Sequence, residues 1–284
     1  MTDVDYAITT MTRRDVDIAV SWAAAEGWNP GHTDAECFFA ADPHGFLMGR
    51  LGDTPVATIS AVRYGAGFGF IGFYIVAPEH RGKGFGLQIW QAAMERLSGR
   101  TIGLDGVVAQ QENYRKSGFS LAYRNVRYEG AGGRPVPDGG GDLVPLATLP
   151  FHVVAGYDRA FFPDDRQAFL DAWIRQPGST ALGIMADGAL VGYGMLRPCR
   201  TGFKVGPLFA DRPAIAERLF QSLQACTEKD APVFLDVPEI NSAAVAMAER
   251  HGMSVMFETA RMYTGTPPQL PVDRIFGVTS FELG

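Results

Sequence analysis

The sequence has few cysteines, no long apolar run and no excess of positive charge, and each shortage excludes a class of protein. Its three cysteines, Cys37, Cys199 and Cys226, lie far apart and in no CxxC spacing. This pattern argues against a disulfide framework or a zinc site and predicts free thiols in a reducing cytosol. The formal net charge of −6 argues against nucleic-acid binding through a broad basic surface.

Signals for membranes and metals are also missing. The longest apolar run, 68–77, contains two glycines and has about half the length needed to span a bilayer. The opening MTDVDYAITT lacks the basic and apolar regions of a signal peptide. The five histidines are scattered without an HxH or HxxxH pair, so no metal site is predicted. We therefore expect a cytoplasmic protein whose partners are neither nucleic acid nor membrane.

The length of the chain indicates two domains. Division of 284 residues by about 150 per domain gives close to two. With 46% hydrophobic and 20% charged residues, the composition is that of an ordinary globular protein. A stretch rich in glycine and proline, 131–142, predicts a linker between a first domain at 1–130 and a second at 143–284.

The two parts repeat one order of elements. Apolar spacing predicts strand, helix, strand, helix and strand over 69–128, and the same order recurs over 203–263. A final apolar stretch, 275–283, predicts one further strand. We therefore expect an α/β (α+β) fold made by tandem duplication, in which each domain has a mixed central sheet flanked by helices.

The segment richest in chemical information is VAPEHRGKGFGL, from Val76 to Leu87. Gly82, Gly84 and Gly86 stand at alternate positions, where they permit dihedrals that place successive N–H groups on one side of a turn. The turn opens into a predicted helix, whose first amides are unpaired and whose dipole end is positive. Such a turn can hold a pyrophosphate.

Other phosphate-binding motifs fit this turn poorly. Lys83 is followed by glycine where a Walker loop needs Ser or Thr after its lysine. Leu87 stands where a dinucleotide fingerprint counted from Gly82 needs glycine. Arg81 and Lys83 could add positive charge to a phosphate site. The alternative is an ordinary glycine-rich turn between a strand and a helix.

The pattern V-x-P-x-x-R-G-x-G-x-G after a buried strand resembles the coenzyme A motif of the GNAT acyltransferase superfamily. The strand 73–76 and the later YRKSGF at 114–119 match the remaining signatures of that family. The resemblance is strong over 5–128 and covers the second part only in its order of elements. It implies an acyl-CoA co-substrate, with acetyl-CoA favoured, and no metal.

The resemblance also implies roles for individual residues. The amides of 82–87 would hold the pyrophosphate, while backbone groups of Tyr74 and Val76 would pair with the pantetheine arm as with another strand. An amide near Tyr74 or Ile75 would donate to the oxyanion that develops on the thioester carbonyl. The full set implied for the cofactor is Tyr74, Ile75, Val76, Arg81, Gly82, Lys83, Gly84, Phe85, Gly86 and Leu87.

Tyr114 occupies the position of the family's general acid. A tyrosine of ordinary pKa near 10 stays protonated at pH 7 and can give a proton to a departing thiolate, whose thiol has a pKa near 8.5. The alternative is a structural tyrosine whose hydroxyl bonds water. The sequence departs from the family at Val107, where asparagine is frequent, so the asparagine's cofactor contact is not transferred.

A general base is missing from the position where the family often has a glutamate, because 64–77 contains no acidic residue. At pH 7 neutralising a lysine-like amine costs about 4.6 kcal/mol, and an α-amine about 1 kcal/mol. The base must therefore come from another element or a water chain, or the acceptor must be weakly basic. We favour an α-amine or similar acceptor of low pKa. Carboxylates that could serve, each also readable as a surface group, are Glu26, Asp34, Glu36, Asp105 and Glu112.

The segment after the first predicted helix, 26–32, lies where this fold usually shapes its acceptor pocket. Glu26, Trp28 and Asn29 are candidates to face the substrate. The alternative makes Asn-Pro-Gly a turn and Trp28 a core anchor.

The second part has lost the features that carry chemistry in the first. At the place of the glycine turn it reads FADRPAIA, 209–216, which has no glycine and contains Asp211, a residue that would repel phosphate. The position of Tyr114 is taken by Ala248. We therefore expect one active site, with the second domain supporting or completing it.

Together these features predict an acyl-CoA-dependent N-acyltransferase that acts on a small-molecule amine by direct attack. One alternative is an acyl-CoA-binding sensor without catalysis, and another is a protein or peptide N-acetyltransferase, which would share the cofactor site. The sequence does not identify the acceptor, the acyl length or the oligomeric state.

Overall fold

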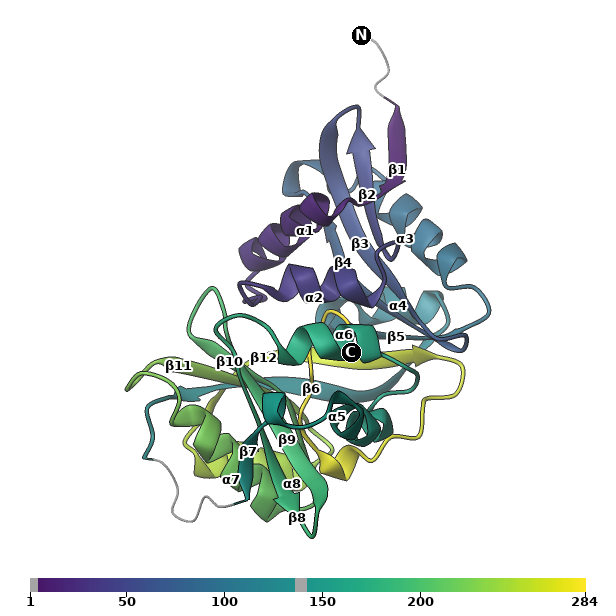
Figure 1. Ribbon diagram of the computed structural model, residues 1–284. Helices are drawn as coiled ribbons and strands as arrows, with labels where there is room; N and C mark the ends of the chain where they lie inside the picture. Colours follow the sequence, from purple (N-terminus) through teal and green to yellow (C-terminus); the bar gives the residue numbers. More distant parts are fainter. Residues whose placement is uncertain (1–4, 136–141) are drawn as a thin grey trace.

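The computed structural model describes residues 5–135 and 142–284 (Figure 1). Its strands are β1 (Tyr6–Thr10), β2 (Phe46–Leu51), β3 (Thr54–Tyr64), β4 (Phe68–Val76), β5 (Thr101–Val107), β6 (Phe119–Ala131), β7 (Leu143–Pro145), β8 (Thr180–Ala186), β9 (Ala189–Pro198), β10 (Phe203–Ala210), β11 (Pro232–Pro238), β12 (Ser254–Thr264) and β13 (Ile275–Gly277). Its helices are α1 (Arg13–Ala25), α2 (Asp34–Ala41), α3 (Phe85–Arg96), α4 (Gln111–Lys116), α5 (Phe151–Asp158), α6 (Gln167–Ile174), α7 (Pro213–Gln224) and α8 (Ser242–Arg250).

Most helices form where apolar residues recur at helical spacing, and α1 and α8 also begin with a polar side chain that caps the first turn. In α1 the buried residues Val16, Ala19, Val20 and Ala23 lie on one face. Thr12 begins this helix with a capping box, since its side chain accepts from the amide of the third helical residue. Such helices cover both faces of a central sheet, as the predicted fold class requires (Figure 1).

The strands join into one mixed sheet with the order β1-β2-β3-β4-β5-β12-β6-β11-β10-β9-β8-β7, and β13 pairs with β10. The two halves of this order mirror each other. In the first half β4 runs parallel to β5, and in the second half β10 runs parallel to β11. The predicted tandem architecture is therefore confirmed.

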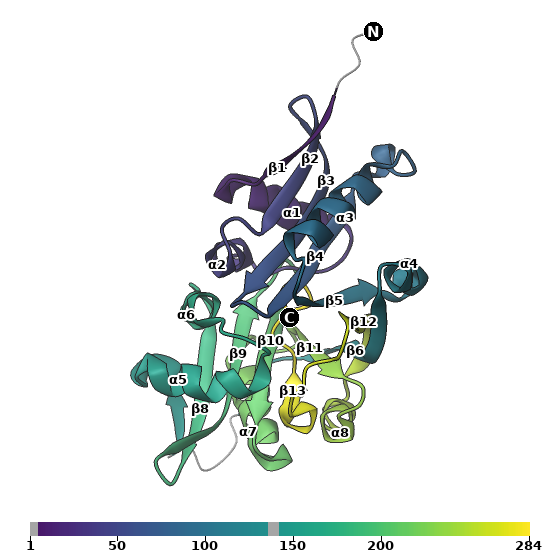
Figure 2. The same ribbon diagram turned by 90° about the vertical axis from the view of Figure 1, so that its right-hand side faces the viewer.

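The halves exchange strands at the centre of the sheet. Strand β12, from the second half, lies between β5 and β6 of the first half. Strand β6 lies in turn between β12 and β11, with Asn125 opposite Pro238 and Ala131 opposite Pro232. In Figure 2 the yellow strand β12 accordingly runs beside the teal strands β5 and β6. The sheet of the first half thus includes a strand from the second half.

Several elements differ from the sequence prediction. Helices α2 and α5 and the short strand β7 were not expected, because their apolar residues do not follow a clear period. Strand β6 continues through Ala131, so the first residue of the predicted linker 131–142 belongs to the sheet. The predicted strand at 275–283 is wrong beyond Gly277, where the chain leaves the sheet.

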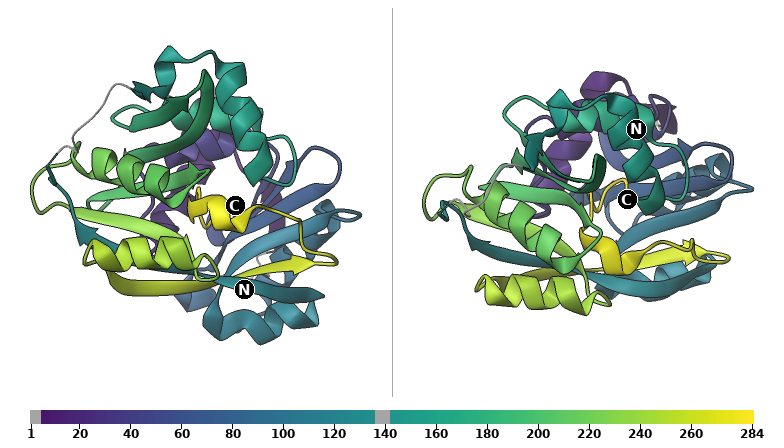
Figure 3. Two further views of the ribbon diagram at one scale, coloured as in Figure 1. Left: turned by 90° about the horizontal axis from the view of Figure 1, so that it is seen from below. Right: turned by 60° about the horizontal axis from the view of Figure 1, so that its bottom comes forward.

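The residues that follow β13 are deeply buried. Five side chains from Val278 to Glu282 are each 8% exposed or less. The backbone oxygens of Leu283 and Gly284 accept hydrogen bonds from the Tyr64 hydroxyl and from Arg166. In the views of Figure 3 this yellow segment lies between the blue strands of the first half and the green strands of the second. It therefore contributes to the core between the halves.

Over residues 5–135 and 142–284, no helix is long and apolar enough to cross a membrane.

Candidate active site

Strand β4 carries an irregularity at its centre. Phe73 has a φ of +48°, unusual for a residue with a side chain, and the register with β3 shifts between Thr58 and Ser60. The Thr58 hydroxyl donates a hydrogen bond of 2.8 Å to the carbonyl oxygen of Phe73 and so holds the distorted backbone. Bulges of this kind are frequent beside active sites, where they redirect backbone groups.

Beyond this bulge β4 separates from its parallel neighbour. The two strands pair only where Phe68–Ile71 faces Thr101–Leu104. The Ala77 amide donates to β3, so the backbone groups of Val76 and, two residues earlier, Tyr74 point away from β3 into the gap. The Val76 carbonyl already accepts a 2.9 Å hydrogen bond from Arg81 Nε. The gap is therefore lined by an open strand edge.

The glycine turn lies at the end of this edge and leads into α3. Gly82 and Gly84 have φ values of +75° and +86°, the left-handed region that favours glycine, and Gly84 caps the helix. Gly86 lies so close to Tyr74 that a Cβ atom there would be 2.8 Å from the Tyr74 hydroxyl. Lys83 is exposed beside them. The turn can present backbone amides and the positive end of α3 to an anion.

A pocket of about 560 Å³ occupies the gap between β4 and β5. Both halves of the chain supply its walls, the second half through β12 and the segment after β13. Its largest contributors from the first half are aromatic. The lining residues are Trp28, Ile71, Gly72, Phe73, Tyr74, Trp90, Leu104, Asp105, Gly106, Val107, Tyr114, Phe257, Thr259, Phe281 and Glu282.

Tyr114 lies on α4 at the border of this pocket. It is 8% exposed and packs on Trp90 with ring centroids 5.6 Å apart. Burial, with a smaller effect of Tyr74, raises the pKa of Tyr114 to about 12. A second pocket of about 680 Å³ shares Tyr74, Trp90 and Tyr114 and reaches Leu87 near the glycine turn. Tyr114 therefore borders both pockets, and its hydroxyl stays protonated at neutral pH.

Among the carboxylates proposed from the sequence, Asp105 alone lines the pocket. Both of its oxygens accept from the Arg261 guanidinium, at 2.8 and 2.6 Å, and Asn125 donates to one of them. These bonds hold Asp105 in the core between β5, β6 and β12, where burial raises its pKa against the pull of Arg261. A carboxylate so fully occupied is poorly placed to take a proton from a substrate.

The other four carboxylates proposed from the sequence do not line the pocket. Glu36 and Glu112 are exposed and pair with Arg13 and Arg115. Glu26 pairs with Arg81 beside the glycine turn. Asp34 is fully buried, unlike a surface carboxylate.

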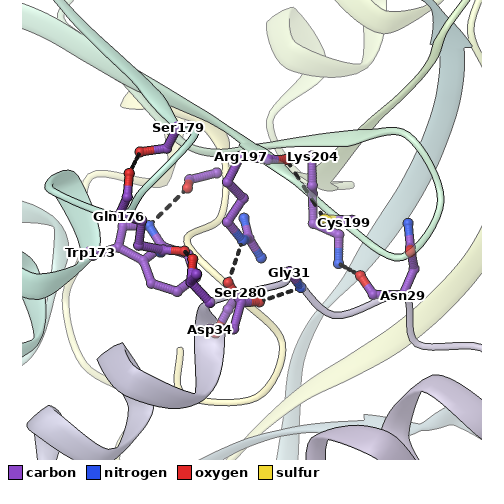
Figure 4. Close-up of polar contacts among 12 residues, drawn as sticks. Asn29, Gly31, Asp34, Trp173, Gln176, Ser179, Arg197, Cys199, Lys204 and Ser280 are labelled. Carbon is purple, nitrogen blue, oxygen red and sulfur yellow. Dashed lines mark hydrogen bonds and ion pairs between the residues drawn. The ribbon is translucent and has the colours of Figure 1, made fainter.

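Asp34 belongs to a buried contact between the halves, shown in Figure 4. It accepts from Arg197 Nε at 2.9 Å and from the Gly31 amide at 2.7 Å. The Arg197 guanidinium lies 4.4 Å from the centroid of the Trp173 ring, while its two terminal nitrogens are buried without a hydrogen-bond partner. Asp34 therefore holds the halves together and does not reach the pocket.

The segment 28–31 is fixed by Arg127 of β6 and by residues of the second half. The Trp28 carbonyl accepts from Arg127 at 2.8 Å. Lys204 Nζ donates to the Asn29 carbonyl at 3.0 Å (Figure 4). The Asn29 side chain exchanges two 2.9 Å hydrogen bonds with the Thr201 backbone. Trp28 packs on the core and also lines the pocket, so both alternatives for it apply, whereas Asn29 is not a lining residue.

Phe281 and Glu282 are among the pocket residues that the sequence analysis missed. They lie in the apolar stretch that was predicted as a strand, and only the single acidic residue in that stretch hinted at another role. Glu282 is 3% exposed, and its carbonyl oxygen lies against β4, so close that a Cβ atom on Gly72 would be 2.0 Å from it. Burial raises the pKa of Glu282, against the opposing pull of Lys204, Arg127 and Arg197.

In the second half, the equivalent gap is filled by the chain itself. Strand β10 pairs with β11 only up to Val205, and beyond that point β13 pairs with β10 at Leu208 and Phe209. Asn241 fixes the approach to β13 by donating to the carbonyls of Val272, Asp273 and Ile275. Within the described residues no group of three metal-ligating side chains is present in either half.

Comparison with known proteins identifies both halves. Residues 14–119 match the acetyltransferase (GNAT) family model, and residues 154–277 match an acetyltransferase (GNAT) domain model. A holothin acyltransferase from Pseudoalteromonas sp. (strain SANK 73390) is 33% identical over 94% of this chain and 90% of its own length.

Solved structures agree in fold. A putative acetyltransferase from Pyrococcus horikoshii, 25% identical, superposes with a TM-score of 0.83 over 100% of this chain and 97% of its own. A tandem GNAT protein from the clavulanic acid biosynthesis pathway, 15% identical, superposes with a TM-score of 0.65 over 93% of this chain and 100% of its own. The chain therefore belongs to the GNAT acetyltransferase family and is a transferase built from two tandem GNAT domains.

Proposed function

We propose that this enzyme transfers an acyl group, most simply acetyl, from acyl-CoA to the amine of a small molecule. The observation that carries the proposal is the gap between β4 and β5, which has the glycine turn at one end and the Tyr114 hydroxyl at the other. An extended thioester arm fits such a gap because the free edge of β4 offers it the backbone groups of a missing strand.

The acyl donor would be held by main-chain groups more than by side chains. The amides of 82–87 and the start of α3 would bind the pyrophosphate, with Lys83 adding charge. Tyr74 would pair with the pantetheine arm, and an amide at the bulge, of Tyr74 or Ile75, would donate to the thioester carbonyl. Arg81 would act indirectly, since its guanidinium already joins the end of β4 to Glu26.

Tyr114 would be the general acid. The amine nitrogen attacks the carbonyl carbon, the new C–N bond forms and the C–S bond breaks, and the sulfur takes the proton of Tyr114. A proton of the nitrogen then leaves through water and restores the tyrosine hydroxyl. A pKa of about 12 keeps this hydroxyl protonated at neutral pH, ready for a thiolate whose own thiol has a pKa near 8.5.

The shape of the pocket favours a small acceptor over a protein chain. Residues of both halves line this space, and small-molecule sites occur preferentially at such junctions between domains. One protein to which this chain is similar is named a holothin acyltransferase. Trp28, Phe257 and Phe281 would form the walls against which the acceptor lies.

The test is thiol release from acetyl-CoA by the purified protein in the presence of a panel of amines, with Tyr114→Phe as the comparison. We expect release that depends on an amine and that falls sharply in the variant. A panel in which polyamines and lysine side chains react far faster than α-amino compounds would contradict the expected acceptor of low pKa. Binding of acetyl-CoA without thiol release from any amine would contradict the enzymatic role.

A further inference from the structure

The pocket contains one carboxylate that no described residue engages. Glu282 lines the pocket and is 3% exposed, yet no hydrogen bond or ion pair of the described residues holds its carboxylate. Its oxygens are not among the sealed, unpartnered polar atoms of the core, so they border accessible space. By contrast, Asp105 in the same pocket is held by Arg261 and Asn125.

The charges around Glu282 leave it without a dedicated counterion. Arg127 pairs with Asp236 at 2.7 and 2.8 Å, and Arg197 pairs with Asp34 at 2.9 Å. The remaining cation of this cluster, Lys204, donates instead to the carbonyl oxygens of Trp28 and Asn29. The positive charges of these residues therefore act on Glu282 without a direct bond and favour its ionised form. Its oxygens remain free to accept a proton.

The backbone of Glu282 is placed beside the reacting region of the first half. Its carbonyl oxygen packs on Gly72, the residue that precedes the bulge at Phe73. The close approach requires glycine, since a Cβ atom there would clash with backbone. The segment is anchored on both sides, by the bond from the Val278 amide to the Asp236 carbonyl and by the bond from the Tyr64 hydroxyl to the Leu283 carbonyl.

We propose that Glu282, supplied by the second half, is the general base that takes the proton from the acceptor ammonium in the pocket of the first half. This assignment rests on the proposed N-acyltransferase function. It gives the site the carboxylate that β4 lacks, and it gives the second half a catalytic residue in place of the cofactor site that β13 fills.

The protons balance as follows. The ammonium gives one proton to Glu282, which later passes it to solvent, and the neutral amine attacks the thioester carbon. The C–S bond breaks, Tyr114 protonates the sulfur, and the second proton of the nitrogen returns through water to the tyrosine oxygen. The products are an amide, free coenzyme A and one proton in solution. Burial, with a smaller effect of Asp34, raises the pKa of Glu282 against the pull of Lys204, Arg127 and Arg197. A raised pKa makes the carboxylate a stronger base.

The test compares two acceptors in the full-length protein, an α-amine that is largely protonated at pH 7 and an arylamine that is neutral there. In Glu282→Gln we expect kcat/KM for the α-amine at pH 7 to fall about 100-fold or more. For the arylamine, kcat/KM should fall less than about threefold. Raising the pH to 9 should restore much of the rate that the variant loses with the α-amine, because more of that amine is then neutral. Glu282→Asp should recover part of the loss, and Asp171→Asn, in a surface pair with Arg175, should behave as wild type.

Two results would overturn the assignment alone. One is an equal loss of kcat/KM for both amines in a Glu282→Gln protein that still binds acetyl-CoA and has the wild-type melting temperature. Such a result would indicate a structural role for Glu282. The other needs no variant: a wild-type pH profile with the same acidic limb for both amines. A wild-type protein that releases no thiol with either amine would overturn the proposed function itself, and this assignment with it.

Discussion

Arg127 and Asp236 form a buried two-point ion pair that joins the two halves of the molecule. Nε and Nη2 of the arginine, on β6, donate to the two carboxylate oxygens of the aspartate, on β11, at 2.7 and 2.8 Å. The third arginine nitrogen donates to the Trp28 carbonyl, and the guanidinium lies 4.9 Å from the centroid of the Phe281 ring. One guanidinium thus contacts two walls of the pocket.

The loss of this pair should destabilise the whole chain. In Asp236→Asn the Arg127 cation stays buried without its counterion, so we expect a loss of about 3–5 kcal/mol in the free energy of unfolding. Denaturant unfolding measures it, and Asp171→Asn, in an exposed pair, should change it by less than about 0.5 kcal/mol. Two separate unfolding transitions in the variant would contradict the view that the halves share one core.

The same pair predicts a direction for acid denaturation. Burial opposes ionisation of Asp236, but Arg127, with smaller contributions from Lys204 and Arg197, lowers the pKa of the carboxylate below its usual value. The stability that this depressed pKa contributes is present above the pKa of the unfolded chain and is lost as the pH falls through the folded one. Between pH 5 and pH 3 the wild type should therefore lose more stability than Asp236→Asn, as thermal melts at each pH can measure.

The glycine turn offers a matched pair of variants. Gly84→Ala and Gly99→Ala both place a side chain at a φ near +80° with open space around it, so each should cost about 1–2 kcal/mol of stability. Gly84 lies in the proposed pyrophosphate turn, whereas Gly99 lies after the other end of α3. We expect the dissociation constant of acetyl-CoA, measured by calorimetry, to rise at least about tenfold in Gly84→Ala and to stay unchanged in Gly99→Ala. An equal rise of the dissociation constant in both variants would contradict the proposal that this turn binds the pyrophosphate.

Each chain should bind one acyl-CoA molecule. β13 occupies the gap of the second half, and Asp211 there already bonds Tyr157 and Arg274. Calorimetric titration of acetyl-CoA should therefore give a stoichiometry of one, and Gly84→Ala should weaken that single event. A second binding event that survives Gly84→Ala would show that the second half retains a site.

Neither half should fold alone. Without the second half, β5 loses its neighbour β12, and β6 loses its neighbours on both edges. A fragment of residues 1–135 should be insoluble or unfolded by circular dichroism, whereas co-expression with residues 142–284 should restore a folded complex. A soluble fragment 1–135 that is fully active would contradict both this expectation and the proposed role of Glu282.

The local features of the first half could be predicted from sequence because they depend on residues close together in the chain. The glycine turn, α3 and Tyr114 on α4 are set by short motifs and by apolar spacing, and they occur where the sequence placed them. Contacts between distant segments could not be predicted in this way. The pairing of β5 with β12 and the position of Glu282 depend on tertiary packing, which leaves no periodic signal.

The carboxylate candidates show the same division. Residue type and position drew attention to Glu26, Asp34 and Asp105, but the side chains that pair with them, Arg81, Arg197 and Arg261, come from other parts of the chain. Sequence can therefore nominate carboxylates, while only the fold determines which of them are already neutralised.

The exchange of β6 and β12 has a consequence for the order in which the protein can assemble during its synthesis. Val107 of β5 meets Thr259 of β12, a residue 152 positions later. At about 5–20 residues per second, a ribosome needs about 8–30 s to make that stretch. Throughout this interval the edge of β5 that faces β12 lacks its partner, so the sheet of the first half closes only after β12 has been made.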